Sequence, residues 1–363
     1  MKKIIILTTL IFSVILLYLA HVSYLYFDMM PFNEKALSIK TFDGLNCPYH
    51  PAVIYAKEGW SGYKYWMAET PYSPQAKPYR DKNECPSIHY SNDGINWEEK
   101  HNPIDSLSCE DIKNLDYFSD PHLVMRNDTI ECWYRITRRH KDVDRRKDVY
   151  LLRKKSADGL NWTEREVLVS CAQDTSCLGK MVVSPAVIYK DSLYQMWYVN
   201  SEGDTRGISF AMSQNGKIWE GKTDCNIYGQ ERQPWHIDVT FIDGQYYLTI
   251  YDFEDITIYR SRDKHNFYKI KTSLTPSKIG SYYGRGLYRA CLIKDEQYKL
   301  YFSADDGFNT YIGLMAGDKI ECMNVVDNGK HATFWDLLSY KFKLDKVRYT
   351  FIIKHALCKF IKI

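Results

Sequence analysis

The distribution of hydrophobic and polar positions repeats along most of the chain. Each copy consists of an apolar strand, a short polar turn and a second strand rich in aromatic residues, a pattern typical of β-hairpins. Five copies are recognisable, and they begin at His50, Asp120, Ser184, His236 and Tyr288. The sequence therefore predicts five structural units rather than one continuous sheet.

A second recurring segment places Asp-Gly or Asn-Gly shortly before an aromatic residue. It occurs as SNDGINW, SADGLNW and SQNGKIW, ending on Trp97, Trp162 and Trp219, and a divergent copy ends on Phe267. These dipeptides supply the positive φ values that a tight hairpin needs. We interpret the segments as turns that hold the units together, without a role in chemistry.

Two hairpins per unit give four antiparallel strands, a sheet too small to bury both of its faces alone. Radial packing of several such sheets solves that problem. The copies start 70, 64, 52 and 52 residues apart, which is the size of a propeller blade. We predict an all-β fold in which residues 40–330 form a five-bladed β-propeller.

The N-terminal segment has a different pattern. Residues 4–27 contain no Asp, Glu, Lys or Arg, and a helix of that length crosses a bilayer of about 30 Å. The one cleavage-like sequence, Tyr18-Leu19-Ala20, carries a bulky Tyr where signal peptidase needs a small residue. We predict that residues 1–29 form an uncleaved signal anchor, a transmembrane helix that leaves the rest of the chain extracytoplasmic, in the cell envelope.

At the other end, residues 331–363 combine apolar residues at helical intervals with six Lys and one Arg. This basic C-terminal tail is predicted to be helical, either packed on the domain or lying on a membrane surface. Ten cysteines fit an oxidising compartment, and Cys171 and Cys177 bracket a loop across which they could pair.

Composition narrows the range of partners. Forty-eight Lys and Arg against 45 Asp and Glu leave a net charge of +3, too weak a field for binding nucleic acid. Aromatic residues make up 15% of the chain, and such rings serve both strand-rich folds and sugar-stacking sites.

The first residues of the five innermost strands are expected to meet at one end of the central channel. Because side chains alternate along a strand, the equivalent positions form two levels. The outer level holds His50, Asp120, Ser184, His236 and Tyr288, and the next holds Ala52, His122, Ala186, Asp238 and Ala290. Burying such polar groups is costly unless they are paired or hydrated, and core packing does not require them. We predict a functional site here.

The loops between the second and third strands should surround this opening. They contribute Glu84 and Glu202, and a basic segment that carries Arg135, Arg138 and three further arginines. Arg138 and its neighbours could hold carboxylate or phosphate groups of an anionic glycan. The alternative is an ordinary solvated loop.

On this blade pattern, the chain resembles the five-bladed propeller glycoside hydrolases, the group that includes families 43, 32 and 130. The resemblance implies three roles in inverting members: an Asp of the first blade acts as base, an Asp of the second blade tunes the pKa of the catalytic groups, and a Glu of the third blade acts as acid. Asp120-Pro121 matches the second-blade Asp. The first and third blades instead have His50-Pro51 and Ser184-Pro185, so the usual base and acid are not carboxylates.

Two hypotheses follow. In the first, the chain is a membrane-anchored glycoside hydrolase-like enzyme that cleaves glycosidic bonds of an envelope or extracellular polysaccharide. Asp120, Asp238, His50 and His236 would be catalytic, and the substrate contacts would be Tyr288, Arg289, Trp235, His122, Glu84, Glu202 and Arg138. In the second, a non-catalytic propeller binds glycan or a partner protein during polymer assembly or export. Neither hypothesis requires a metal or other cofactor; relatives hold a channel ion such as calcium, and no residue pattern here demands one.

Geometry should separate the two hypotheses. Asp120 and Asp238, with a third carboxylate about 5–10 Å away across one open pocket, would suit glycoside cleavage. A channel plugged by aromatic rings, or carboxylates paired with arginines, would favour binding without catalysis.

Overall fold

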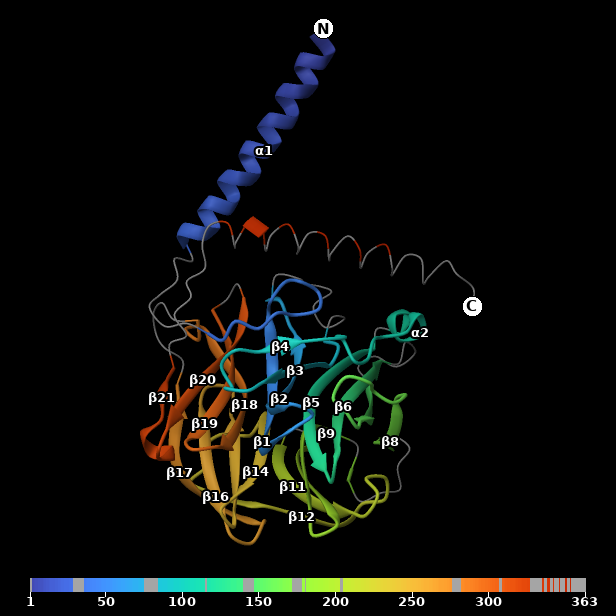
Figure 1. Cartoon of the computed structure of the whole chain (residues 1–363), viewed down its shortest axis with the longest axis vertical. Helices are drawn as coiled ribbons and strands as arrows, with labels where there is room; N and C mark the ends of the chain where they lie inside the picture. The colour runs from blue at the N-terminus through green and yellow to red at the C-terminus, as the bar shows by residue number, and fades with distance from the viewer. Residues whose placement is uncertain are drawn as a thin grey trace.

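The computed structural model describes residues 2–28, 36–74, 84–114, 116–139, 147–171, 178–179, 181–202, 205–275, 282–306 and 309–326, with isolated positions between 335 and 353. These residues form one long N-terminal helix, α1 (Lys2–Asp28), and five small β-sheets (Figure 1). Two short helical segments, α2 (Cys109–Lys113) and η3 (Ile320–Cys322), lie within the sheet region.

Each sheet is one blade, and consecutive strands pair antiparallel. Blade 1 contains β1 (Pro48–Trp60), β2 (Tyr63–Pro71), β3 (Ser87–Ser91) and β4 (Glu98–Glu99). Blade 2 contains β5 (Tyr117–Arg126), β6 (Thr129–Arg139), β7 (Lys147–Ser156) and β8 (Glu166–Ser170). Blade 3 contains β9 (Val182–Lys190), β10 (Leu193–Glu202), β11 (Thr205–Ser213) and β12 (Glu220–Asp224).

The last two blades follow the same order. Blade 4 contains β14 (His236–Ile242), β15 (Gln245–Tyr251), β16 (Ile256–Ser261) and β17 (Asn266–Leu274), with β13 (Asn226–Tyr228) added parallel to β17 at the outer edge. Blade 5 contains β18 (Gly286–Lys294), β19 (Tyr298–Asp305), β20 (Thr310–Gly317) and β21 (Asn324–Val325).

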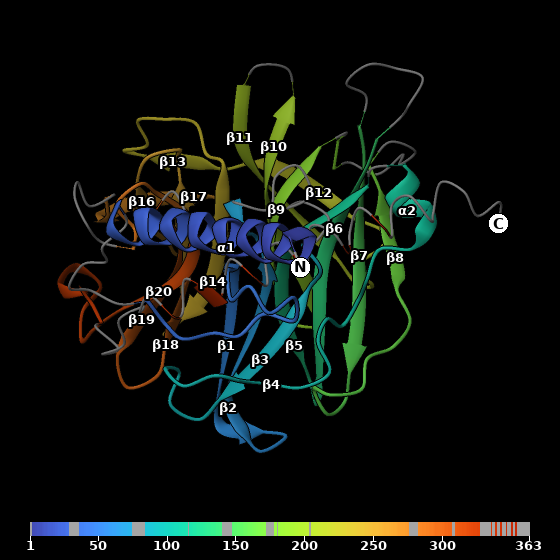
Figure 2. The ribbon, with the colours of Figure 1, turned by 90° about the horizontal axis from the view of Figure 1, so that it is seen from above.

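The innermost strands close a ring. Neighbours along the series β1, β5, β9, β14 and β18 contact one another, and β18 contacts β1. Seen from above, the sheets lie around a common centre (Figure 2). The predicted all-β, five-bladed propeller is confirmed, and each predicted unit start lies in or at the start of an innermost strand.

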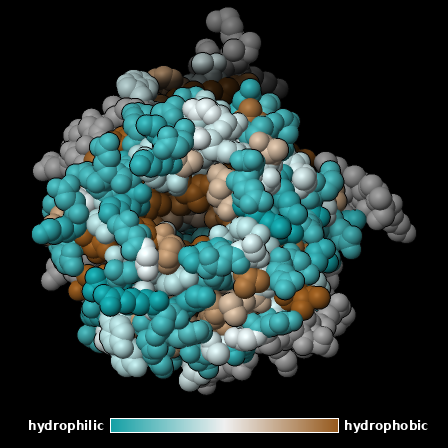
Figure 3. Space-filling view, turned by 60° about the horizontal axis from the view of Figure 1, so that its bottom comes forward, coloured by the Kyte–Doolittle hydropathy of each residue, from teal (hydrophilic) through white to brown (hydrophobic). Residues whose placement is uncertain are grey.

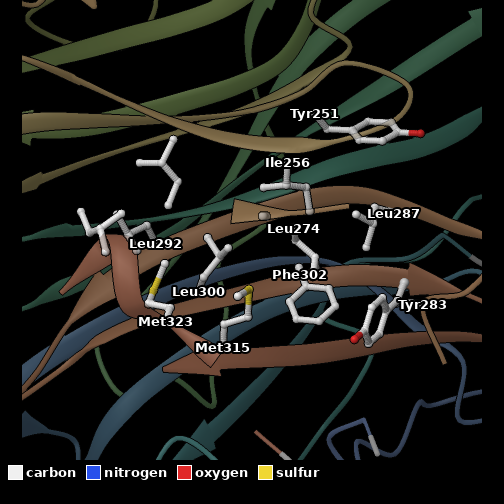
Figure 4. Close-up of a cluster of buried hydrophobic side chains, with 14 of the residues drawn as sticks. Tyr251, Ile256, Leu274, Tyr283, Leu287, Leu292, Leu300, Phe302, Met315 and Met323 are labelled. Carbon is white, nitrogen blue, oxygen red and sulfur yellow. The ribbon is translucent and has the colours of Figure 1, made fainter. Parts of the chain in front are cut away.

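The hydrophobic core lies between the blades. In the cluster shown in Figure 4, Tyr251, Ile256 and Leu274 of blade 4 pack against Leu292, Phe302 and other residues of blade 5. Every sheet therefore buries its faces only because its neighbours cover them.

The repeated Asp/Asn-Gly turns join adjacent blades. Gly159 has a φ of +76°, and a Cβ there would lie 2.2 Å from the Trp66 ring of blade 1; Gly216 is similarly close to Trp133 of blade 2. Asp158 holds its turn by accepting hydrogen bonds from the backbone N–H groups of Leu160 and Asn161. These contacts match the structural role expected for the segments.

The N-terminal helix extends away from the propeller (Figure 1). By length and composition, α1 can cross a membrane. Residues 36–39 pack against blade 5, where Leu37 N–H donates to Ile312 O. Cys177 and most of residues 327–363 lie outside the described residues, so the predicted cysteine pairing, the tail and the domain limits 1–29, 40–330 and 331–363 stay predictions.

Candidate functional site

Irregularities at the start of the innermost strands shape the site. His50, Asp120 and Ser184 each precede a proline and have φ values of 55°, 52° and 49°. The strand register shifts between Tyr49 and Ala52 and at the equivalent places of β5 and β9. At each place two residues of the innermost strand therefore lie opposite one residue of the neighbouring strand, which is a β-bulge. Left-handed backbone at non-glycine residues is strained and concentrates at functional sites.

The bulges bring three chemically active side chains together. One potential ligand atom from each of His50, Asp120 and His236 lies within 4.8 Å of the others. All three residues are at most 3% exposed. They come from blades 1, 2 and 4, so they are far apart in the sequence. The closed ring of innermost strands brings them together.

Asp120 uses one carboxylate oxygen for support and leaves the other free. Its Oδ2 accepts from Arg135 Nε at 2.7 Å and from the Ser184 backbone N–H at 3.0 Å, and Arg135 Nη2 lies 2.6 Å away. Its Oδ1 lies 3.4 Å from His236 Nδ1. Among the described residues, that oxygen and both His236 ring nitrogens have no hydrogen-bond partner.

The two histidines differ in how they are held. His50 Nδ1 is hydrogen-bonded to Thr70 Oγ1 at 2.7 Å, which leaves Nε2 as the nitrogen for a ligand. His236 is fixed through its backbone neighbours, because the Ser184 hydroxyl donates to Ile237 O and accepts from Ile237 N–H, both at 3.0 Å. Ser184 thus connects Asp120 to the strand that carries His236.

The surroundings set the charge of each group. Burial lowers the pKa of His50 to about 3 and holds the pKa of His236 well below its usual value of 6.5. Burial alone would raise the pKa of Asp120, but the permanently charged Arg135 guanidinium holds it well below the usual value. Two neutral imidazoles and one carboxylate are the protonation states that a divalent cation requires.

A second polar layer lies beneath the first, at the predicted next level. Asp238 Oδ1 is 3.2 Å from His122 Nδ1 and 3.7 Å from Arg289 Nη2. Arg289 is fully buried and donates to Pro121 O at 2.7 Å. We therefore place His122, Asp238 and Arg289 below the opening; the substrate contacts predicted for His122 and Arg289 stay predictions.

This layer also marks the inner end of a channel from the opposite face. The channel has a volume of about 390 Å³ and runs from His122 and Asp238 between mostly apolar side chains to Tyr55, Lys190 and Lys294. Figure 3 shows a hollow with a partly hydrophobic lining on that face. Neither Asp120 nor either histidine of the upper cluster lines it.

Aromatic side chains surround the upper cluster. The Tyr288 ring centroid lies 4.1 Å from that of His236 and 5.2 Å from that of His50. Trp235 Nε1–H donates to Tyr288 Oη at 2.9 Å. Both predicted contact residues are therefore beside the cluster.

The charged candidates of the rim are more scattered. Burial raises the pKa of Tyr288, and the buried Glu84 is one of the neighbouring groups that raise it further. Arg138 lies 3.6 Å from Asp116 and 3.8 Å from Asp111, and the glycan contact predicted for it stays a prediction. Glu202 ends β10, but its side chain lies outside the described residues, as do those of the basic segment after Arg138.

One assignment from the sequence is wrong. The arginines at 135 and 138 do not belong to a loop, because both lie within β6. Arg135 is buried and pairs with Asp120. The alternation of that strand turns its side chain toward the axis, and a count of loop arginines could not reveal this.

The arrangement meets one condition that was expected to favour binding without catalysis, carboxylates beside arginines. The two carboxylates of the ring lie against Arg135 and Arg289, which does not suit a pair that cleaves glycosidic bonds. The unpartnered atoms of Asp120 and His236, however, are unlike an inert structural ring. Two histidines and one carboxylate with free ligand atoms fit a divalent metal ion.

Comparison with known proteins supports the fold. No family model matches the chain. An A type blood N-acetyl-α-D-galactosamine deacetylase of Flavonifractor plautii is 23% identical over 289 residues, which cover 66% of this chain and 37% of that protein. The chain thus spans little more than a third of this relative's length.

Solved structures show the same architecture. The crystal structure of an N-acetylgalactosamine deacetylase from F. plautii, in complex with blood group B trisaccharide, has a TM-score of 0.65 at 17% identity and covers 87% of this chain and 98% of that one. A xylan β-1,4-xylosidase from Bacillus halodurans has a TM-score of 0.55 at 15% identity, over 79% and 56% of the two chains. The chain has a glycosidase-like propeller fold.

Proposed function

We propose that this chain is a metal-dependent hydrolase that acts on carbohydrates and removes the acetyl group from an N-acetylated amino sugar. The observation that carries the proposal is the buried group of His50, Asp120 and His236, whose free ligand atoms converge. A cation bound there would acidify a water molecule and polarise the amide carbonyl oxygen. The reaction consumes water and yields an amine and acetate.

The residues of the chain would prepare that site in defined ways. Arg135 and Ser184 occupy Asp120 Oδ2 and turn Oδ1 toward the histidines. Thr70 orients His50. Such supporting hydrogen bonds are typical of metal ligands. Tyr288 and Trp235 would contact the sugar, and the buried carboxyl group of Glu84, which acts on Tyr288, would exchange a proton.

The similarity to a deacetylase supports this choice of bond. The expected cleavage of a glycosidic bond uses two carboxyl groups on opposite sides of that bond, whereas both carboxylates of the ring lie beside arginines. We further propose that α1 anchors the enzyme in the membrane, with an envelope polysaccharide as the substrate.

Purified full-length protein tests the proposal. It would be incubated with a panel of acetylated amino-sugar oligosaccharides, and acetate and new reducing ends would be measured separately, before and after chelation and after return of Zn²⁺ or Mn²⁺. We expect metal-dependent acetate release that falls at least about 100-fold in Asp120→Asn and His236→Gln. His265→Gln, on the outer part of blade 4, is the matched control.

The result can go against the proposal in two ways. Acetate release that is insensitive to the chelator and to both variants would exclude this metal site. New reducing ends without acetate would instead favour glycosidase activity.

A further inference from the structure

An exposed aromatic residue at the rim has a strained backbone. Phe253 lies in the turn 252–255 between β15 and β16, with a φ of 75° and a side chain that is 53% exposed. The Asp252 side chain fixes this turn by accepting from the N–H groups of Glu254 and Asp255. A bulky residue seldom adopts left-handed backbone, and strain of this kind persists where it serves a function.

Two further side chains extend the Phe253 ring into a platform. Its centroid lies 5.2 Å from that of Trp235. The Arg206 guanidinium lies 4.3 Å from the Trp235 centroid and 5.1 Å from the Phe253 centroid. In the part of the chain that the structure describes, Arg206 forms no ion pair, so its N–H donors remain available to a ligand.

The platform borders the proposed metal site. Tyr251, the last residue before the turn, pairs with His236 across β15 and β14. Trp235 directly precedes His236, and their rings are 5.6 Å apart. A substrate that reaches His236 with one sugar would therefore place its next sugar over Trp235 and Phe253.

The charges of the turn indicate which sugars fit. Asp252, Glu254 and Asp255 share one cation, Arg232, at 3.8, 2.7 and 3.5 Å. Because the carboxylates of the turn outnumber its cations, the turn disfavours a negatively charged sugar, even beside Arg206. Aromatic faces bind the apolar faces of sugar rings, and Arg N–H groups donate to hydroxyl oxygens.

We infer that Phe253, Trp235 and Arg206 form a subsite for a neutral sugar that neighbours the reacting amino sugar, so that the substrate is an oligosaccharide or polymer. This inference rests on the proposed function for the identity of the reacting sugar. The subsite itself requires only binding.

Binding measurements on the full-length, metal-stripped protein test the subsite without any turnover. The protein is kept in a polyoxyethylene detergent, which contains no sugar, and is titrated with N-acetylglucosamine, chitotriose, N-acetylgalactosamine and blood group A trisaccharide. We expect at least one oligosaccharide to bind 10-fold or more tightly than its monosaccharide. Phe253→Ala and Phe253→Gly should reduce that ratio below threefold, whereas Tyr268→Ala, which removes an exposed tyrosine from the outer edge of the same blade, should preserve it.

Thermal unfolding of the same variants separates binding from structural roles. Because glycine adopts positive φ without strain, Phe253→Gly should unfold at a higher temperature than Phe253→Ala while both lose the binding preference. The inference is overturned if the wild type does not prefer an oligosaccharide, if both Phe253 variants keep the preference, or if Phe253→Gly is the less stable variant. If the preference is present but no acetate is released, the proposed function fails and the subsite stands.

Discussion

Arg135 offers the most quantitative test of how the site is held. Its guanidinium contacts Asp120 Oδ2 through Nε at 2.7 Å and Nη2 at 2.6 Å, and Nη1 donates to Val182 O at 3.1 Å. Asp120 is 1% exposed and Arg135 8%. Arg135→Met keeps much of the volume but leaves a buried carboxylate whose remaining donor to Oδ2 is the Ser184 N–H.

The expected cost follows from this burial. Removing one member of a buried ion pair costs about 3–5 kcal/mol, against a total stability of about 5–15 kcal/mol for a typical domain. Asn tolerates the left-handed backbone at position 120, so Asp120→Asn mainly leaves the Arg135 guanidinium without its negatively charged partner. In the double variant neither charge remains, so its loss should be about 2–3 kcal/mol smaller than the sum of the single losses.

Equilibrium unfolding in urea at pH 7, followed by tryptophan fluorescence, measures these differences on metal-free protein. Lys154→Met is a control on the same blade, because it removes a partly buried lysine that donates to Ile104 O and lies outside the site. A loss below about 1 kcal/mol for Arg135→Met, or strictly additive losses in the double variant, would refute the view that Arg135 supports Asp120.

Three other predictions concern the blades, a buried carboxyl group and the anchor. Gly159→Ala should cost about 2–5 kcal/mol, from positive φ and overpacking against Trp66; an unchanged melting temperature would exclude this turn as a link between blades. Burial raises the pKa of Glu69 well above its usual value of 4.5, so the folded chain keeps a proton that the unfolded chain loses, and stability falls as pH rises above 4.5. Glu69→Gln should remove that loss, and its stability relative to wild type should grow by up to about 1.4 kcal/mol per pH unit between pH 5 and 8 in urea titrations; a constant difference would contradict the assigned protonation. Deletion of residues 1–35 should move the protein from the membrane pellet to the supernatant after ultracentrifugation, and retention in the pellet would show that α1 is not the anchor.

The fold was predictable because its signals are local and repeated. Alternating strands recur in all five blades and Asp/Asn-Gly turns in three, with a divergent copy of the turn in a fourth, and each recurrence supports the same interpretation. Aligning the copies also placed Asp120 and His236 at one level and His122 and Asp238 at the next, as the contacts between them show.

The chemistry of the site was harder to predict because it depends on contacts between blades. The three candidate metal ligands are 70 and 116 residues apart, so no ligand spacing exists in the sequence; only the shared level of His50, Asp120 and His236 could have suggested them. The bulges also change the simple alternation of side chains. Neither Arg135 beside Asp120 nor the strained turn at Phe253 has a local signature that distinguishes it from an ordinary charged or aromatic position.

The account depends most on a metal ion bound between blades 1, 2 and 4. Anomalous X-ray scattering from crystals of the protein soaked in Zn²⁺ or Mn²⁺ tests this directly. We predict one strong peak about 2.0–2.2 Å from Asp120 Oδ1 and from a ring nitrogen of each of His50 and His236, absent in Asp120→Asn. A peak elsewhere, or no peak at a metal concentration that supports acetate release, would contradict the claim.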